Sequence, residues 1–522
     1  PYRIYGAQQD NTALRISHRS SGESITERDW EPTAGGESAH LAPDPKNNQI
    51  VYGGTYKGYM NRLDHTTGQA RSTNVWPDNP AGSGAEIMKY RFNWNYPVAF
   101  SRHDSNKLYA GSNFLHVTTD EGQSWKTISP DLTRSLPETI ESSGGPITQD
   151  NTGAEFYSNI FVISESVLEK NVIWTGSDDG LIHVTKDNGT TWTNVTPPAS
   201  MSHKGTVYVA ATAYKFGDYT PYLYKTDNYG ESWTLITNGI KDNYYTRVIR
   251  TDLVREGLLY AGTEWGMYIS FDDGKSWAPF QLNLPITAIR DLQVRDNDLI
   301  VATHGRSFWI IDDLTPLHQI SSEVANSDFY LYKPDTSYRM HQSGGWNEPD
   351  PKLVGKNHPD GVIINYVLNK FHESDSVQLE ILEKDGTLIQ RYSTSAKENK
   401  LDPTATKQLK VKAGGNHMVW DMRYQGYKSF EGMIFYSSPN KGPKAIPGIY
   451  KLKLTVNGTS KEQEFKIVKD PRLPNTQSDY QEQFDFLIVV RDQVSKANEA
   501  IIKIRSIQKD LKYLKEKTKD ND

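Results

Sequence analysis

Four carboxylates in this chain are candidates for acid–base chemistry on a glycosidic bond. They are Asp10, Asp178, Asp179 and Glu264. Glycoside hydrolysis uses two carboxyl groups about 5–9.5 Å apart, one as the acid and the other as the base or nucleophile. Spacing along the sequence does not show that any two of the four converge, and a turn cap or a solvated charge explains each of them. The catalytic residues are therefore left unassigned.

A second set of side chains is suited to binding a ligand by stacking and ion pairing. Aromatic rings and guanidinium groups stack on sugars or peptide side chains, and Asn, Glu and His supply hydrogen bonds. Most of these residues directly follow strands that are expected to end in small residues near a channel mouth. The predicted ligand-binding residues are Tyr56, Asn93, Trp94, Glu264, Trp265, His304 and Arg306. For His304 and Arg306, bracing of the last strands is the alternative.

No sequence pattern indicates a metal or a cofactor. The chain contains no His-Glu-x-x-His, EF-hand loop, Gly-x-Ser-x-Gly or P-loop pattern. It also contains no cysteine, which excludes disulfides, thiolate catalysis and Cys-ligated zinc. We therefore expect neither a metal nor a cofactor.

A phrase that recurs four times indicates the elements that position these candidates. The pattern Ser/Thr-x-Asp-x-Gly-x-x-Trp begins at Thr118, Thr185, Thr226 and Ser270, with Asn replacing Asp in the third copy. The Asp caps a turn, the Gly adopts a conformation that a Cβ penalises, and the Trp begins the next strand. Asn caps a turn as well as Asp but cannot replace a catalytic carboxylate, so the phrase is structural. Its predicted structural residues are Asp120, Trp125, Asp187, Trp192, Asn228, Trp233, Asp272 and Trp277.

Seven apolar segments that end in small residues recur over the same region. They lie at residues 4–7, 50–54, 108–112, 173–177, 207–211, 259–263 and 300–303. Four-stranded units of about 40–50 residues around a central channel fit this spacing. The sequence therefore predicts a mainly β protein with a seven-bladed β-propeller over residues 1–315. We expect the first blade to be incomplete, so that the last blade or an upstream segment closes the ring.

The sequence pattern of the chain changes after residue 315. Residues 316–360 are predicted to be a linker, and short alternating strands over residues 361–470 predict an immunoglobulin-like β-sandwich. Residues 475–522 are predicted to form a coiled-coil-like helix, with a capping box at Ser478 and Gln481. Its apolar positions keep a 3-4 spacing that Gln508 interrupts once: Leu487, Val490, Val494, Ala497, Ile501, Ile504, Leu511 and Leu514. The stripe packs on its own domain, pairs with a later helix, or forms an intermolecular seam.

Composition narrows the function classes. The 522-residue chain has a formal net charge of −6, so it carries no basic field for nucleic acid. It contains no apolar run of about 18 residues, so no transmembrane segment is expected. Aromatic residues make up 11% of the chain, which suits a propeller core and equally a carbohydrate or peptide surface. The lack of cysteine, and of a visible signal peptide, fits the mature part of an exported bacterial protein.

The repeated phrase resembles the Asp-box, or BNR repeat, of sialidases, sortilin ectodomains and two-propeller xyloglucanases. The whole chain resembles the C-terminal half of large exported Bacteroidota-type proteins described as sortilin-like or glycosyl-hydrolase-like. The stretches that carry this resemblance are residues 91–97, 129–134, 177–184 and 302–309. The resemblance implies an upstream N-terminal propeller half as a partner, in the same protein or as a separate chain. In the xyloglucanases the catalytic acids lie between two propellers, so one acid could belong to that half.

Two readings of function follow. The first is a non-catalytic binding or scaffold protein of the bacterial periplasm, outer-membrane surface or extracellular space that holds a protein, peptide or glycan. The second is a glycoside hydrolase, similar to a xyloglucanase, that acts on a polysaccharide. The lack of an assignable acid pair favours the first reading.

Overall fold

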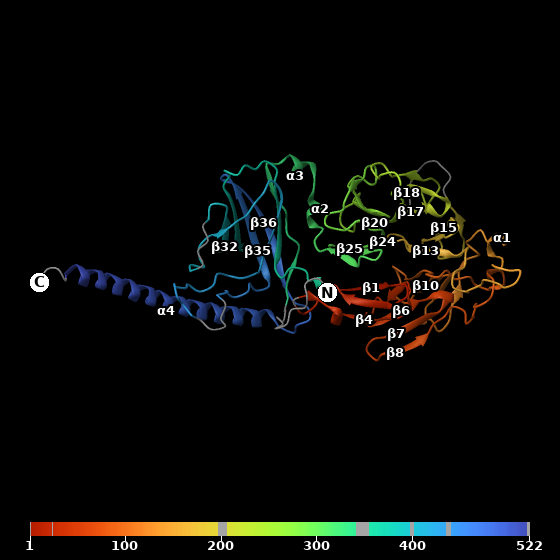
Figure 1. The fold of residues 1–522 in the computed structure, drawn as a ribbon, viewed down its shortest axis with the longest axis horizontal. Coiled ribbons are helices and arrows are strands. Elements are labelled where there is room, and N and C mark those ends of the chain that lie inside the picture. Colours follow the sequence, from red (N-terminus) through yellow and green to blue (C-terminus); the bar gives the residue numbers. More distant parts are fainter. Residues whose placement is uncertain are drawn as a thin grey trace.

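The computed structural model describes residues 2–22, 24–196, 206–340, 354–396, 401–434 and 440–518. Over these ranges the protein is mainly β, with many small sheets and one long C-terminal helix, α4 (Gln477–Thr518). In Figure 1 the sheets of residues 3–311 occupy the right of the molecule, the later sheets its middle, and α4 extends to the left.

Seven small antiparallel sheets follow one another between residues 3 and 311. The first sheet contains β1 (Arg3–Ala7), β2 (Ala13–Ser17) and β4 (Trp30–Pro32). The second contains β5 (Leu41–Pro43), β6 (Ile50–Gly54), β7 (Met60–Asp64) and β8 (Gln69–Ser72). The third contains β9 (Val98–Phe100), β10 (Leu108–Gly111), β11 (Leu115–Thr118) and β12 (Lys126–Thr127). The fourth and fifth consist of β13 (Ile160–Glu165), β14 (Ile173–Ser177), β15 (Ile182–Thr185) and β16 (Thr193–Asn194); and β17 (Val207–Ala213), β18 (Asp218–Thr226) and β19 (Thr234–Leu235). The last two consist of β20 (Thr246–Thr251), β21 (Leu259–Thr263), β22 (Gly266–Ser270) and β23 (Ala278–Pro279); and β24 (Ile289–Arg295), β25 (Asp298–Thr303) and β26 (Phe308–Ile311).

The small residues of the predicted segments allow neighbouring chain segments to approach closely. A Cβ on Gly53 of β6 would lie 2.5 Å from the backbone of Ala34, and one on Gly262 of β21 would lie 2.7 Å from the side chain of Ile289 in the next sheet. Real Cβ atoms do not make such contacts, so only glycine fits there. The close packing of successive sheets therefore depends on these positions.

The repeated phrase forms the same turn in all four copies. In the first copy, Asp120 accepts hydrogen bonds from the backbone N–H and the hydroxyl of Ser124, at 2.9 and 2.6 Å, and from the hydroxyl of Thr118, at 2.7 Å. The Trp125 indole donates to the carbonyl of Thr73, which precedes this sheet in the chain. Asn228 accepts from the backbone N–H of Ser232 in the same way. The turn thus joins two strands of one sheet and ties that sheet to the chain before it.

The sheets surround one central cavity. Strands β5, β9, β13, β20 and β24, each the first of its sheet, contribute to the cavity lining. Strand β5 contacts β9, and β20 contacts β24, so first strands of adjacent sheets lie side by side. Small antiparallel sheets arranged in this way form a β-propeller.

Two further sheets, of three and six strands, form a sandwich after the propeller. One contains β27 (Phe329–Leu331), β30 (Val362–Leu368) and β34 (Gly414–Trp420). The other contains β28 (Ser337–Arg339), β36 (Thr459–Lys469), β35 (Gly448–Val456), β31 (Val377–Glu383), β32 (Leu388–Ser393) and β33 (Lys407–Gln408). One hydrophobic core joins them, with Trp420 and Tyr450 at its centre. The segment expected to be a linker supplies β27, whose Phe329 and Leu331 are buried in this core, and β28, which pairs with β36.

The remaining elements are short. Strand β3 (Ser24–Ile25) pairs with β29 (Gly355–Lys356) and so joins the propeller to the later part of the chain. The short helices are α1 (Pro137–Ile140), α2 (Thr315–Gln319), α3 (Ser322–Asn326) and the 3-10 turns Glu27–Asp29, Tyr56–Gly58, Ala85–Ile87 and Tyr214–Phe216.

Helix α4 begins at a different cap from the predicted one. The backbone N–H of Thr476 donates to Asp479, and the Thr476 hydroxyl accepts from the Asp479 N–H, so the capping box is Thr476 and Asp479. Ser478 lies inside the first turn and donates to Glu482. The first part of α4 packs on the sandwich through Tyr480, Phe484 and Asn498. The predicted apolar stripe lies beside this face and is largely exposed among the described residues.

Candidate functional site

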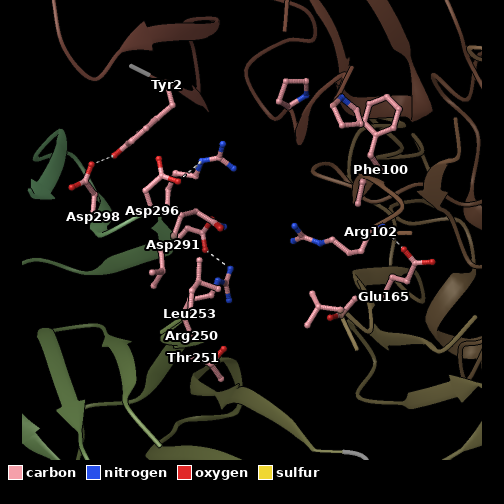
Figure 2. Close-up of a pocket in the computed structure, with 18 of the residues that line it drawn as sticks. Tyr2, Phe100, Arg102, Glu165, Arg250, Thr251, Leu253, Asp291, Asp296 and Asp298 are labelled. Carbon is pink, nitrogen blue, oxygen red and sulfur yellow. Dashed lines mark hydrogen bonds and ion pairs between the residues drawn. The ribbon is translucent and has the colours of Figure 1, made fainter. Parts of the chain in front are cut away.

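The central cavity is the candidate site, and its volume is about 1990 Å³. Strands of six of the seven sheets contribute to its lining, and the first sheet contributes through Tyr2, His18 and Arg19 beside its strands. Tyr338, His358 and Ile363 from the segment after the propeller also line it. Figure 2 shows two walls facing each other, with Arg250 and Asp291 on one side and Arg102 and Glu165 on the other. A cavity of this size accommodates a polymer segment rather than a small metabolite alone.

The rim of the cavity carries exposed aliphatic side chains. Val162, Val167 and Leu168 belong to β13 and the loop after it, and Leu253 and Val254 follow β20. Between 53% and 90% of each residue is exposed. Exposed apolar side chains gathered at one opening mark an interaction site more often than a chance feature of the surface.

Charged side chains lie on the two walls of the cavity beside this aliphatic rim. Arg250 forms a 2.6 Å ion pair with Asp291 across the gap between β20 and β24. On the facing wall, Glu165 accepts a hydrogen bond from the backbone N–H of Arg102 and one of 3.3 Å from the Tyr109 hydroxyl. The exposed side chain of Arg102 points into the cavity (Figure 2). Both walls therefore offer charge beside apolar surface.

One corner of the cavity holds buried titratable groups. The Tyr2 hydroxyl donates a 2.8 Å hydrogen bond to Asp298, and the Tyr2 ring stacks on His18 with centroids 3.8 Å apart. Burial raises the pKa of Asp298 to about 7 and lowers the pKa of His18 to about 4. Burial also raises the pKa of Asp312. At neutral pH, His18 is therefore uncharged and Asp298 is close to half protonated.

A carboxyl group that is half protonated at neutral pH is suited to general acid–base work. Asp298, however, is only 6% exposed, and its carboxylate is engaged by Tyr2. Among the described residues, no group of three or more His, Cys, Asp or Glu side chains could hold a metal ion. The carboxyl group of Asp298 can therefore exchange a proton near neutral pH, but it is too buried to form an open reaction centre.

The sequence-predicted candidates lie at the other end of the strands. The cavity includes the loops that join first to second strands, whereas Tyr56, Asp178, Glu264 and His304 follow second strands. Because neighbouring strands run antiparallel, these two kinds of loop lie at opposite ends of a sheet. None of the predicted candidates is among the described residues that line the cavity: Asp10, Tyr56, Asn93, Trp94, Asp178, Asp179, Glu264, Trp265, His304 and Arg306.

The structure brings several of those candidates into hydrogen-bonded pairs. Asn93 donates a 3.1 Å hydrogen bond to Asp178, which also accepts from the backbone N–H of Asn159. Burial raises the pKa of Asp178. Asp179 accepts 2.7 Å and 2.5 Å hydrogen bonds from the backbone N–H of Arg134 and the hydroxyl of Ser177. Both carboxylates thus fix the path of the loops around them.

The remaining predicted candidates divide into a paired group and an exposed group. Glu264 forms a 2.7 Å ion pair with Arg247, whose guanidinium lies over the Tyr214 and Tyr245 rings. His304 accepts a 2.9 Å hydrogen bond from Arg290. The exposed group comprises Asp10, Arg306 and Trp265, while Tyr56 and Trp94 are half-buried. The structure gives no contact that joins Asp10 to the other three candidate acids.

Comparison with known proteins identifies solved structures but no family. No model of a known protein family matches the chain, and no curated protein matches it. A GH74 xyloglucanase from Xanthomonas campestris is 16% identical with a TM-score of 0.41, and the match covers 59% of this chain and 50% of that one. A GH74 enzyme from Niastella koreensis is 13% identical with a TM-score of 0.39, covering 88% and 70%. YCF48 bound to a D1 peptide is 15% identical with a TM-score of 0.37, covering 63% and 91%.

This chain spans half the length of the Xanthomonas enzyme that it matches. Similarity at these identities assigns no activity to the chain. Among the described residues, no helix has both the length and the apolar character needed to cross a bilayer.

Sequence reasoning missed the residues that form the cavity. Asp298 follows the tight turn of Asp296 and Asn297 and begins an apolar strand, and a carboxylate at such a position was the available signal. Leu168 and Leu253 are single aliphatic residues in polar loops, and no periodic pattern marks them. Only the ring of sheets brings these two loops to one opening.

Proposed function

We propose that this chain is a non-catalytic propeller protein, exported to the bacterial cell envelope or surface, whose cavity holds a protein or peptide partner. The observation that carries the proposal is the aliphatic rim of Val162, Val167, Leu168, Leu253 and Val254 beside charged walls. A polypeptide offers the apolar side chains and the charges that match such a rim. Glycans stack on aromatic faces instead, and the rim residues are aliphatic.

We infer that each of the seven sheets is one blade of a propeller over residues 1–315. We further infer that residues 361–470, together with β27 and β28, form an immunoglobulin-like sandwich, and that residues 475–522 form a helical extension. The support is the order of the sheets and the core that the two sheets after the propeller share. Removal of residues 475–522 should leave a folded propeller and sandwich if these boundaries hold.

The contacts of the candidate acids with other residues of the protein support a non-catalytic role. Asp178, Asp179 and Glu264 each hold hydrogen-bond or ion-pair partners within the protein. A glycosidase needs two carboxyl groups that both face the substrate. In this chain the loop-bracing contacts account for the three carboxylates.

A peptide-display experiment tests the proposed function. Random peptides selected on the immobilised chain should bind the wild type about tenfold more tightly than the Leu168→Asp and Leu253→Asp variants, since burying an aliphatic side chain contributes about 1.5–3 kcal/mol. Ile147→Asp is the matched control, because Ile147 is 94% exposed but does not line the cavity. Equal binding by all three variants would show that the rim is not the binding surface.

The glycoside hydrolase remains a second candidate because two buried acids have raised pKa values. Burial raises the pKa of both Asp178 and Asp298, as a general acid requires. In this reading an upstream propeller half supplies the second carboxyl group. Reducing-sugar release from xyloglucan, lost in Asp178→Asn or Asp298→Asn but kept in Asp10→Asn, would establish this candidate and reject the non-catalytic one.

A further inference from the structure

Arg102 differs from the other arginines of the cavity because its side chain has no partner within the protein. It lies in the loop between β9 and β10, is exposed, and points across the cavity toward Arg250 and Asp291 (Figure 2). Its guanidinium forms no ion pair or hydrogen bond with another described residue, and only its backbone N–H is bonded, to Glu165. Arg102 is therefore a cation that a ligand in the cavity can bind without breaking an interaction within the protein.

The other arginines that line the cavity already have partners. These are Asp291 for Arg250, at 2.6 Å, Asp296 for Arg295, at 3.8 Å, and His18 for Arg19, at 3.0 Å. To bind an anion, each of these arginines would have to give up or share its partner, which costs part of the binding energy. Recognition of an anionic group in a ligand therefore falls to Arg102.

Most of the carboxylates that line the cavity also accept a bond from within the protein. The donors are Tyr109 to Glu165, Tyr229 to Glu169, Arg250 to Asp291, Tyr2 to Asp298 and Asn365 to Asp313. A cationic group of a ligand would have to compete with these bonds, and the desolvation of both charges offsets much of what a new ion pair contributes. The charges of the cavity therefore favour an anion at Arg102 over a cation at these carboxylates.

The loop of Arg102 is fixed beside the aliphatic rim. Its backbone N–H donates to Glu165 at the end of β13, and the His103 ring donates a 2.7 Å hydrogen bond to the carbonyl of Ser166. Leu168 of the rim follows Ser166 in the same loop. Apolar surface and an unpaired cation thus belong to two loops that are bonded to each other. A polypeptide segment that covers Leu168 can therefore place a neighbouring side chain at Arg102.

We propose that the cavity selects polypeptide segments that carry an aspartate or glutamate among apolar residues, and that Arg102 binds this side-chain carboxylate. This inference rests on the proposed function and names the sequence character of the partner. A guanidinium and a carboxylate can form two parallel N–H···O bonds, which fix the register of the segment as well as adding attraction. Because Arg102 is exposed, its charge should act mainly on specificity and on the rate of association.

Peptide selection on a charge-reversed variant is the test. A random dodecapeptide library is selected on the immobilised wild type and on Arg102→Glu. The wild-type pool should be enriched several-fold in Asp and Glu relative to the unselected library, whereas the Arg102→Glu pool should be enriched in Lys and Arg. Arg102→Gln should lose the acidic preference without gaining a basic one. Arg28→Glu is the matched control, because Arg28 is also exposed and its side chain is unpaired among the described residues, but it does not line the cavity.

Exchange of the two charges then shows whether Arg102 contacts the acidic residue. A selected peptide with a single acidic residue is synthesised with an amidated C-terminus, so that its only carboxylate is that side chain, and again with this residue replaced by Lys. The replacement should weaken binding to the wild type about tenfold and should strengthen binding to Arg102→Glu. The association rate of the acidic peptide should also fall with rising salt for the wild type, and much less for Arg102→Gln.

Three results would overturn the inference. They are equal acidic enrichment on the wild type and on Arg102→Glu, an excess of Lys and Arg in the wild-type pool, and no recovery of binding on charge exchange. Each of them leaves the proposed function standing if Leu168→Asp and Leu253→Asp still weaken peptide capture. Capture that is insensitive to those two variants, or no capture at all, would reject the proposed function and the inference with it.

Discussion

The hydroxyl of Tyr2 donates a 2.8 Å hydrogen bond to the carboxylate of Asp298, and this bond joins the first small sheet to the last. The two residues lie 296 positions apart in the chain. The bond sits in a corner where Tyr2 also stacks on His18, so burial governs the protonation of both titratable neighbours. The contact between Tyr2 and Asp298 is therefore expected to depend on pH.

As pH rises from about 4 to about 7, deprotonation of Asp298 should lower the free energy of unfolding of the protein. Its pKa is raised to about 7 in the folded state, above the unfolded value of about 3.9. The folded state binds more protons in that window, so the free energy of unfolding decreases as pH rises and levels off above pH 7. In Asp298→Asn, the difference in the free energy of unfolding between pH 4 and pH 7 should be smaller than in the wild type by up to a few kcal/mol. Urea unfolding from pH 4 to pH 8 measures it, with Asp242→Asn as the control, because Asp242 is exposed and does not contribute to the pKa shift of Asp298.

The repeated turn should contribute an opposite dependence at acid pH. Hydrogen bonds from the backbone and side chain of Thr191 lower the pKa of Asp187 to about 2. Its contribution is complete above the unfolded pKa of about 3.9 and is lost as pH falls toward 2. In Asp187→Asn, which copies Asn228 of the third turn, the gap in unfolding midpoint from wild type should shrink as pH falls from 5 to 2. A constant gap would contradict this account.

Burial should rank the cost of truncating the tryptophans of the turns. Trp277 is buried, and its indole donates a 2.6 Å hydrogen bond to the carbonyl of Ile236. Trp277→Ala should reduce the free energy of unfolding by about 3–5 kcal/mol, as for large aromatic truncations in cores. Trp192 makes the equivalent 3.0 Å bond to Ile128 but is only half-buried, so Trp192→Ala should cost less. Chemical denaturation of both variants provides the comparison.

Close packing predicts that Gly53 resists even a methyl group. A Cβ there would lie 2.5 Å from the backbone of Ala34 and Gly35, which cannot move as a side chain can. Gly53→Ala should destabilise the protein by about 1–3 kcal/mol, the usual cost of overpacking. Gly415→Ala in β34 is the matched control, because nothing lies within 4 Å of its Cβ position. A loss of stability in the control equal to that of Gly53→Ala would contradict the packing explanation.

The sequence by itself determined the local structure of the propeller. The phrase at Thr118 contains its own turn, because Asp120 bonds Ser124 only four residues away. The equivalence of Asn228 to Asp was readable for the same reason, since both side chains place an acceptor at one position. Strands that end in small residues were recognisable because the positions where two chain segments approach closely require glycine, and glycine is visible in the sequence. These features depend on neighbours in the chain, which a sequence shows directly.

The tertiary structure alone decided where side chains meet. The cap lies at Thr476 rather than at the predicted Ser478, because α4 begins at Gln477 and Ser478 is already inside its first turn. The cavity, the rim around Leu168 and Leu253, and the Tyr2–Asp298 bond unite residues from different sheets. Such meetings depend on how many sheets close the ring and how they tilt. Those quantities are set by packing summed over the whole propeller, and no single segment of sequence records them.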